Sequence, residues 1–196
     1  MLKKISNIIF FTFTLCISAC ANNATPPDSR NKVVPLIEMN GKSWVDGSIP
    51  FLTIHDVHRQ AEVWAICASA WKLASELMKD ESPAQSKQFR ETYNGAKIAV
   101  GMTYMIDFIS SPRDVDSTLQ IDKFNATWKF AKVAMVSLPE SKLTVIMADF
   151  ETSDNVNWLK DHLATLNVCG QNIEAQQYYI DMWRNLATSG LIVLPD

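Results

Sequence analysis

Between residues 53 and 188, apolar side chains recur at intervals of three and four positions, with polar residues between them. This spacing is typical of amphipathic α-helices, because it places the apolar side chains on one face. The first such row consists of Val57, Ala61, Trp64, Ala68, Trp71 and Met78. The whole chain has only six glycines, and this disfavours a β fold built from many tight turns. The pattern therefore predicts an all-α fold.

Local signals divide this region into separate helices. The expected helices span about residues 54–78, 83–110, 114–137, 139–152, 155–168 and 172–188. Thr53 and Asp56 have the spacing of a capping box, with Thr53 at the N-cap and Asp56 at the third helical position. Pro139 is expected to open a new helix, since proline fits the first helical position and disrupts a helix interior. We therefore predict a bundle of five or six helices.

The residues before the first helix form two segments of different character. Residues 20–35 are small, polar and proline-containing, and this composition predicts a flexible tether. Residues 36–52 mix apolar and turn residues, and Asn40-Gly41 favours a hairpin turn between two short extended pieces. A flat strap across the helices, pinned by Trp44 and Phe51, fits equally well. We expect residues 36–196 to form a single helical domain.

The first 19 residues have the organisation of a secretory signal peptide. Lys3 and Lys4 make a basic start, and the apolar run that follows is shorter than the roughly 20 residues of a spanning helix. A buried N-terminal helix is disfavoured, because the run has no polar face at helical spacing. Removal of residues 1–19 takes away both lysines and no acidic residue, so the formal net charge changes from -3 to -5.

The end of this segment, Ile17-Ser18-Ala19-Cys20, resembles the lipobox of bacterial lipoproteins, in which an aliphatic residue and two small residues precede a cysteine. The resemblance implies cleavage before Cys20 and acylation of Cys20. Such a lipid implies attachment to a membrane, because two or more acyl chains anchor a protein stably. Ala21, in place of aspartate, resembles an outer-membrane sorting signal, so we expect the periplasmic side of the outer membrane. The alternative is ordinary cleavage after Ala19, with Cys20 left free.

Two cysteines remain beside Cys20 after such processing. Cys67 lies on the first apolar row, between Trp64 and Trp71, and Cys169 lies at an expected helix junction. Two thiols in an oxidising compartment are good candidates for a disulfide, here closing a loop of about 100 residues. The alternative is two separate buried thiols that pack as small hydrophobic side chains.

Charge and spacing argue against metal and nucleic-acid sites. Lysine and arginine are dispersed and the chain is net acidic, so there is no electrostatic case for nucleic-acid binding. His55, His58 and Glu62 follow one helix face at a spacing that can ligate a metal. Capping by His55 and a His58–Glu62 pair explain the same residues, and His162 lies far along the chain. We therefore predict no metal and no cofactor.

The remaining chemically notable residues are also assigned to structure. Glu140-Ser141 resembles the Glu-Ser pair of lytic transglycosylases, but the glycine-rich sequence expected after that pair is absent. Met102 and Met105 are expected to fill gaps in the core, and Asp107 is expected to face solvent or cap a neighbouring group. The sequence contains no G-x-S-x-G and no P-loop motif. We therefore expect a protein that is not an enzyme.

These features favour a lipid-anchored protein of the cell envelope that acts as a helical protein-interaction module, of an assembly, inhibitor or immunity type. Helical surfaces rich in tryptophan and methionine are suited to docking a partner protein in a groove. The alternative is a small-molecule carrier, or an enzyme of unfamiliar type, with a pocket between helices. An apolar surface patch favours the module, whereas a buried charged cluster around one deep cavity favours the alternative.

Overall fold

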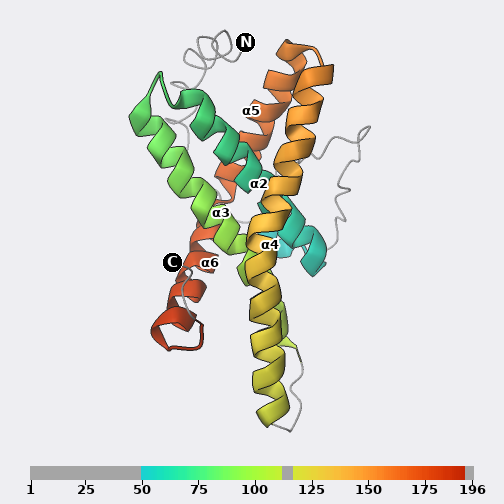
Figure 1. The fold of residues 1–196 in the computed structure, drawn as a ribbon, viewed down its shortest axis with the longest axis vertical. Helices are drawn as coiled ribbons and strands as arrows, with labels where there is room; N and C mark the ends of the chain where they lie inside the picture. Colours follow the sequence, from blue (N-terminus) through green and yellow to red (C-terminus); the bar gives the residue numbers. More distant parts are fainter. Residues whose placement is uncertain (1–49, 112–116, 193–196) are drawn as a thin grey trace.

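The computed structural model describes residues 50–111 and 117–192. Predictions about the signal peptide, Cys20, the tether, Asn40-Gly41 and Trp44 concern residues outside this range. Within it the chain is helical and has no strand, so the predicted all-α bundle is confirmed (Figure 1). The elements are η2 (Phe51–Thr53), α2 (Val57–Met78), α3 (Pro83–Ser110), α4 (Ser117–Thr152), α5 (Asn155–Gln171) and α6 (Ile173–Thr188).

The central helix is α2, and α3, α4 and α5 all pack against it (Figure 1). Trp64 and Trp71 of the predicted apolar row are buried, and so are residues off that row, such as Ile66 and Leu73. Alanines at positions 61, 65, 68, 70 and 74 are buried among these larger side chains. Their small size lets three helices approach α2 from different sides, which explains why burial extends beyond one face.

Small residues also set the spacing between α3 and its neighbours. The Ser75 hydroxyl donates to the Ser86 carbonyl at 2.9 Å, and the Ser86 hydroxyl donates to the Ser75 carbonyl at 2.8 Å, which joins α2 and α3 near their turn. Further along α3, a Cβ added at Gly101 would lie 2.6 Å from both Cγ and Sδ of Met135 on α4. The absence of a side chain at Gly101 therefore allows α3 and α4 to pack closely.

The start of α2 differs from the predicted capping box. Thr53 ends the turn η2, where its hydroxyl donates to the Pro50 carbonyl at 2.7 Å. The N-cap is instead Asp56, whose Oδ1 accepts a hydrogen bond from the Arg59 amide at 2.8 Å. The prediction of Thr53 as N-cap is therefore wrong by three residues, because η2 uses Thr53 for its own turn. Phe51 is buried against Trp64, with ring centroids 4.8 Å apart, but the strap that it was expected to pin lies mostly outside the described residues.

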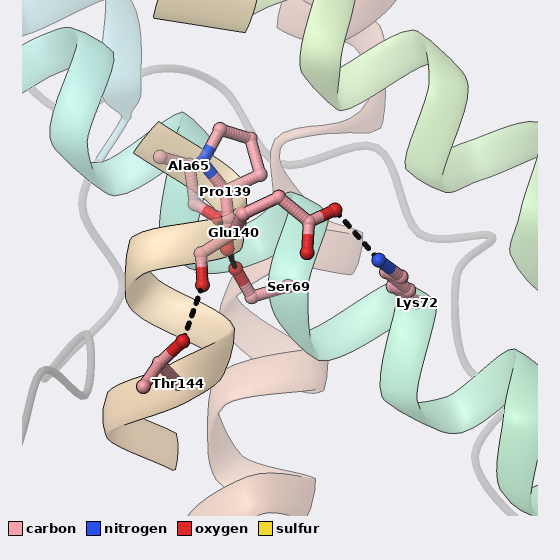
Figure 2. Close-up of polar contacts among 6 residues, drawn as sticks. All are labelled: Ala65, Ser69, Lys72, Pro139, Glu140 and Thr144. Atoms are coloured by element: carbon pink, nitrogen blue, oxygen red, sulfur yellow. Dashed lines mark hydrogen bonds and ion pairs between the residues drawn. The ribbon is translucent and has the colours of Figure 1, made fainter. Parts of the chain in front are cut away.

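The largest correction concerns Pro139. The sequence predicted one helix ending near residue 137 and another opened by Pro139, but α4 is a single helix with Pro139 in its interior. Figure 2 shows the polar contacts that Pro139 and Glu140 of α4 make with α2 at this point. The Ser69 hydroxyl of α2 donates to the Pro139 carbonyl at 2.6 Å and is also 2.9 Å from the Ala65 carbonyl. Pro139 itself is buried.

The residue after this proline adds an ion pair at the same crossing. Lys72 Nζ on α2 lies 2.6 Å from Oε1 of Glu140, and the Glu140 carbonyl accepts from the Thr144 hydroxyl at 3.0 Å (Figure 2). The hydrogen bond to Glu140 raises the pKa of Lys72 above its usual value. A proline in a helix interior removes one backbone hydrogen bond. At Pro139 this loss is accompanied by burial of the ring and by contacts from α2.

The predicted breaks after α4 and after α6 are confirmed. Asp154 caps α5 by accepting from the Val156 amide. At the end of α6, the Gly190 amide donates to the Ala187 carbonyl and the Leu191 amide donates to the Leu186 carbonyl, both at 3.0 Å. This is a Schellman motif, and the φ of +73° at Gly190 is the left-handed conformation that it requires of glycine.

The boundary between α5 and α6 lies at Asn172, two residues after the predicted position at Cys169-Gly170. Asn172 is buried, and its side chain accepts from the Phe51 amide at 2.8 Å while donating to the Val168 carbonyl at 3.0 Å. One side chain therefore ties η2, at the beginning of the described chain, to the α5–α6 junction.

The two cysteines that the sequence analysis paired are brought together in the core. Cys67, in the middle of α2, and Cys169, near the end of α5, lie at disulfide distance with their Cα atoms 5.6 Å apart. Both are almost fully buried. A bond here joins residues separated by 102 positions and fixes α5 on the central helix.

Candidate functional site

A hollow on the described surface lies where three helix ends meet. It has a volume of about 660 Å³ and is formed by the end of α3, the beginning of α4 and the residues at the end of α6. We call it the terminal groove. Its apolar lining residues are Phe108, Ile109, Ile121, Phe124, Leu186 and Leu191.

The terminal groove has an aromatic wall and an exposed apolar rim. Phe108 and Phe124 meet edge to face, with centroids 6.1 Å apart, and Leu186, which also lines the groove, is buried. Ile121 and Leu191 stand at the rim with 61% and 56% of their surface exposed. Exposed apolar side chains beside a hollow mark surfaces that bind other molecules, because burying them is favourable.

The polar lining of the terminal groove is sparse. Ser111, Gln120 and Asn125 contribute neutral side chains, and Lys123 is the single charged residue among those that line it. The arrangement offers apolar contact and a few orienting hydrogen bonds. It presents no pair of acid and base groups of the kind that general acid–base catalysis requires.

The sequence pattern did not predict this groove. Phe124 lies at helical spacing with the buried Trp128, whereas Ile121 and Leu191 stand apart from the apolar rows. Exposed apolar residues away from a helix's apolar row are a weak signal in a sequence, because single ones are common on protein surfaces.

A second cluster of functional groups lies where the beginning of α2 meets α3 and α4. Glu62 forms an ion pair with Lys142 of α4, and His58 Nδ1 lies 3.5 Å from the Tyr104 hydroxyl of α3. The predicted His58–Glu62 pair is therefore replaced by contacts between helices. Burial first, and then the carboxylates of Glu62 and Asp56, raise the pKa of Tyr104, so its phenol stays protonated and is not a base near neutral pH.

The histidines are not brought together. His55 is exposed at the entrance to α2, whereas His162 is buried on α5. No group of three or more His, Cys, Asp or Glu side chains suited to a metal occurs within the part of the chain that the structure describes. The His162 ring stacks on Trp158, with centroids 5.2 Å apart and planes 8° apart. Burial lowers the pKa of His162 to about 4, so the ring is neutral at pH 7.

The other residues considered in the sequence have structural positions. Met102 and Met105 are buried in the core and Asp107 is exposed, as expected. Glu140 pairs with Lys72 at the α2–α4 crossing. Among the described helices, none combines the length and apolar character needed to cross a membrane.

Comparisons with known proteins identify no relative of this chain. No protein-family model, no curated protein and no solved structure matches it.

Proposed function

We propose that this protein is a lipid-anchored, non-enzymatic module of the cell envelope that binds an apolar segment of a partner protein in the terminal groove. The observation that carries the proposal is the groove itself, with its aromatic wall of Phe108 and Phe124 and its exposed rim of Ile121 and Leu191. The lipobox-like sequence at Cys20 supports the anchor.

The shape and lining of the groove support binding to a protein segment. It is framed by helix ends and bordered by exposed apolar side chains, which is the arrangement that receives the apolar face of a helix or an extended segment. Aromatic residues in the centre of such surfaces contribute much of the binding energy, because they bury a large area at a small entropic cost.

The alternative of a small-molecule carrier rests on the volume of the groove. The groove volume of about 660 Å³ falls within the range of roughly 300–1,000 Å³ that is typical of ligand pockets. Against this, half-exposed side chains at the rim leave the hollow open, whereas ligand sites enclose most of the surface of their ligand. We therefore favour the protein partner.

The anchor is tested by the Cys20→Ser chain. We expect the parent protein to fractionate with membranes and to carry a lipid mass on Cys20, and the variant to remain unprocessed or become soluble. One acyl chain binds a bilayer only marginally, so removal of both sulfur-linked chains should abolish stable attachment. A Cys20→Ser protein that is still processed and equally membrane-bound would refute the anchor and leave the groove proposal standing.

The groove is tested by photo-crosslinking in the native envelope. A photoreactive residue at position 121 or 191 should yield the same discrete adduct with one protein, since both positions border the groove. Val156, which is 71% exposed at the start of α5, provides the matched control and should yield no such adduct. Ile121→Asp should abolish the adduct formed from position 191, whereas Val156→Asp should not.

Two results would contradict the groove proposal. Equal adducts from positions 121, 191 and 156 would indicate contact without specificity. Absence of adducts, together with a small molecule that remains bound in native mass spectrometry and is lost in Ile121→Asp, would identify a carrier instead.

A further inference from the structure

Exposed apolar side chains are concentrated on the first half of α4. Of the ten large hydrophobic residues that are exposed in the described chain, five lie on this helix between positions 119 and 136. Ile121 borders the terminal groove, and the others share a different side. We define the outer face of α4 as Leu119, Ala126, Phe130, Val133 and Val136.

The outer face is a mainly apolar strip opposite the core. At 3.6 residues per turn, its five residues fall within about 120° of the helix circumference. The opposite side, which includes Trp128, Ala131 and Met135, is buried in the bundle. Figure 1 shows this half of α4, in yellow, continuing beyond its crossing with α2. The helix is therefore apolar on two sides, and packing within the bundle buries only one of these sides.

Exposure along this strip is large. Phe130, Val133 and Val136 have 51%, 60% and 57% of their surface exposed. Phe130 makes an edge contact with Tyr104, at 4.9 Å between centroids, which leaves one side of its ring facing outward.

The charges around the strip are predominantly positive. Lys123 borders one edge and Lys132 the other, while Lys129 and Asp122 lie within the strip. Asp122 is the single acidic residue between positions 119 and 137. All four side chains are exposed. The chain as a whole has a formal net charge of -3, so this face is basic on an acidic protein.

This combination distinguishes between two candidate partners. A second copy of the chain would bring lysines against lysines, and like charges across an interface oppose association. An anionic lipid surface attracts the same lysines, while the apolar strip enters the boundary between headgroups and acyl chains. Long lysine side chains along a strip can extend from the apolar layer to lipid phosphates.

We propose that the outer face of α4 binds the surface of a lipid bilayer that contains anionic headgroups. Phe130 and Val133 insert at the acyl boundary, and Lys129 and Lys132 contact the phosphates. The inference goes beyond the proposed function, because it needs neither Cys20 nor the terminal groove. An anchored chain would hold this face close to the bilayer and raise its effective concentration there.

The test uses an unlipidated chain of residues 20–196 with Cys20→Ser, which contains every described helix. It is mixed with vesicles of phosphatidylethanolamine containing about a quarter phosphatidylglycerol, and bound protein is measured by flotation. We expect binding that falls about tenfold or more on vesicles of phosphatidylcholine alone. Lys129→Glu should lower the partition coefficient by about 25-fold, since each unit of charge near an anionic surface contributes about fivefold.

The apolar contribution is tested by the double variant Phe130→Ser, Val133→Ser. We expect its partition coefficient to fall by at least about tenfold, because two large apolar side chains no longer leave water. Val156→Ser and Lys87→Glu are the matched controls on exposed positions of α5 and α3, and they should bind as the parent chain does. Far-ultraviolet circular dichroism and thermal midpoints verify that each variant is folded.

Three outcomes would overturn the proposal. The first is no flotation of the folded parent chain with anionic vesicles. The second is flotation that the outer-face variants and the control variants reduce equally. The third is a dimer in the absence of vesicles that Phe130→Ser, Val133→Ser dissociates, which would make the outer face an interface between copies.

Discussion

A Cys67→Ala, Cys169→Ala chain should lose about 4 to 5 kcal/mol of unfolding free energy relative to the oxidised protein. The two cysteines are 102 positions apart. In the chain-entropy treatment, closing a loop of about 100 residues lowers the entropy of the unfolded chain and so raises its free energy by roughly 4.7 kcal/mol. The thermal midpoint should fall by roughly 10 °C or more. Urea unfolding of the oxidised protein, the reduced protein and the variant measures the difference.

Single variants provide the sharpest control for this prediction. Cys67→Ala or Cys169→Ala alone already opens the loop, so each should be nearly as destabilised as the double variant. Costs of the two single variants that sum to the cost of the double variant would instead indicate two independently packed thiols. Alkylation of the unfolded, unreduced protein gives a direct count, and free thiols at both positions would refute the bond.

Acidification from pH 7 to about pH 4 should remove on the order of 3 kcal/mol of unfolding free energy from the protein through His162 alone. Burial lowers the pKa of His162 from 6.5 to about 4 in the folded state. Between these two values the unfolded chain binds more protons than the folded chain, so stability falls as the pH falls. The contribution is fully present above pH 6.5 and is lost as the pH passes down through about 4.

The comparison that isolates this effect uses His162→Phe, which keeps an aromatic ring beside Trp158 and cannot titrate. Urea unfolding is measured at several pH values from 7 to 4, and the parent should lose stability more steeply than His162→Phe across the window. His55→Gln, at an exposed position, should follow the parent curve. Parallel curves for the parent and His162→Phe would show that the buried ring does not titrate in this window.

Several features of the fold follow from residues that are close together in the sequence. Apolar residues at helical spacing predicted the all-α class, and the structure confirms the expected helix start at residue 83 and helix end at residue 188. Signals of this kind act within one helical turn, because the amide and carbonyl groups that they satisfy belong to neighbouring residues. The pairing of Cys67 with Cys169 was also predictable, since few cysteines compete for partners.

Other features were decided only by contacts between distant segments. Pro139 has the local preference of a helix start, and a proline inside a helix costs about 3 kcal/mol. Burial of its ring and the hydrogen bond from Ser69 belong to the α2–α4 crossing, which no local pattern specifies. Asp56 replaced Thr53 as the cap for a similar reason, since η2 is held in place through Asn172.

The candidate binding surfaces were also decided by contacts between distant segments. The terminal groove exists because the ends of three helices, far apart in the sequence, meet at one place. Trp128 and Met135 of α4 lie in the core at helical spacing, whereas the exposure of Phe130 and Val133 on the other side depends on which neighbours pack there. The sequence by itself thus determined the all-α class and most helix boundaries, and the lipid anchor at Cys20 stays a prediction. The tertiary structure determined which apolar side chains stay in contact with solvent, because exposure depends on what packs against each helix.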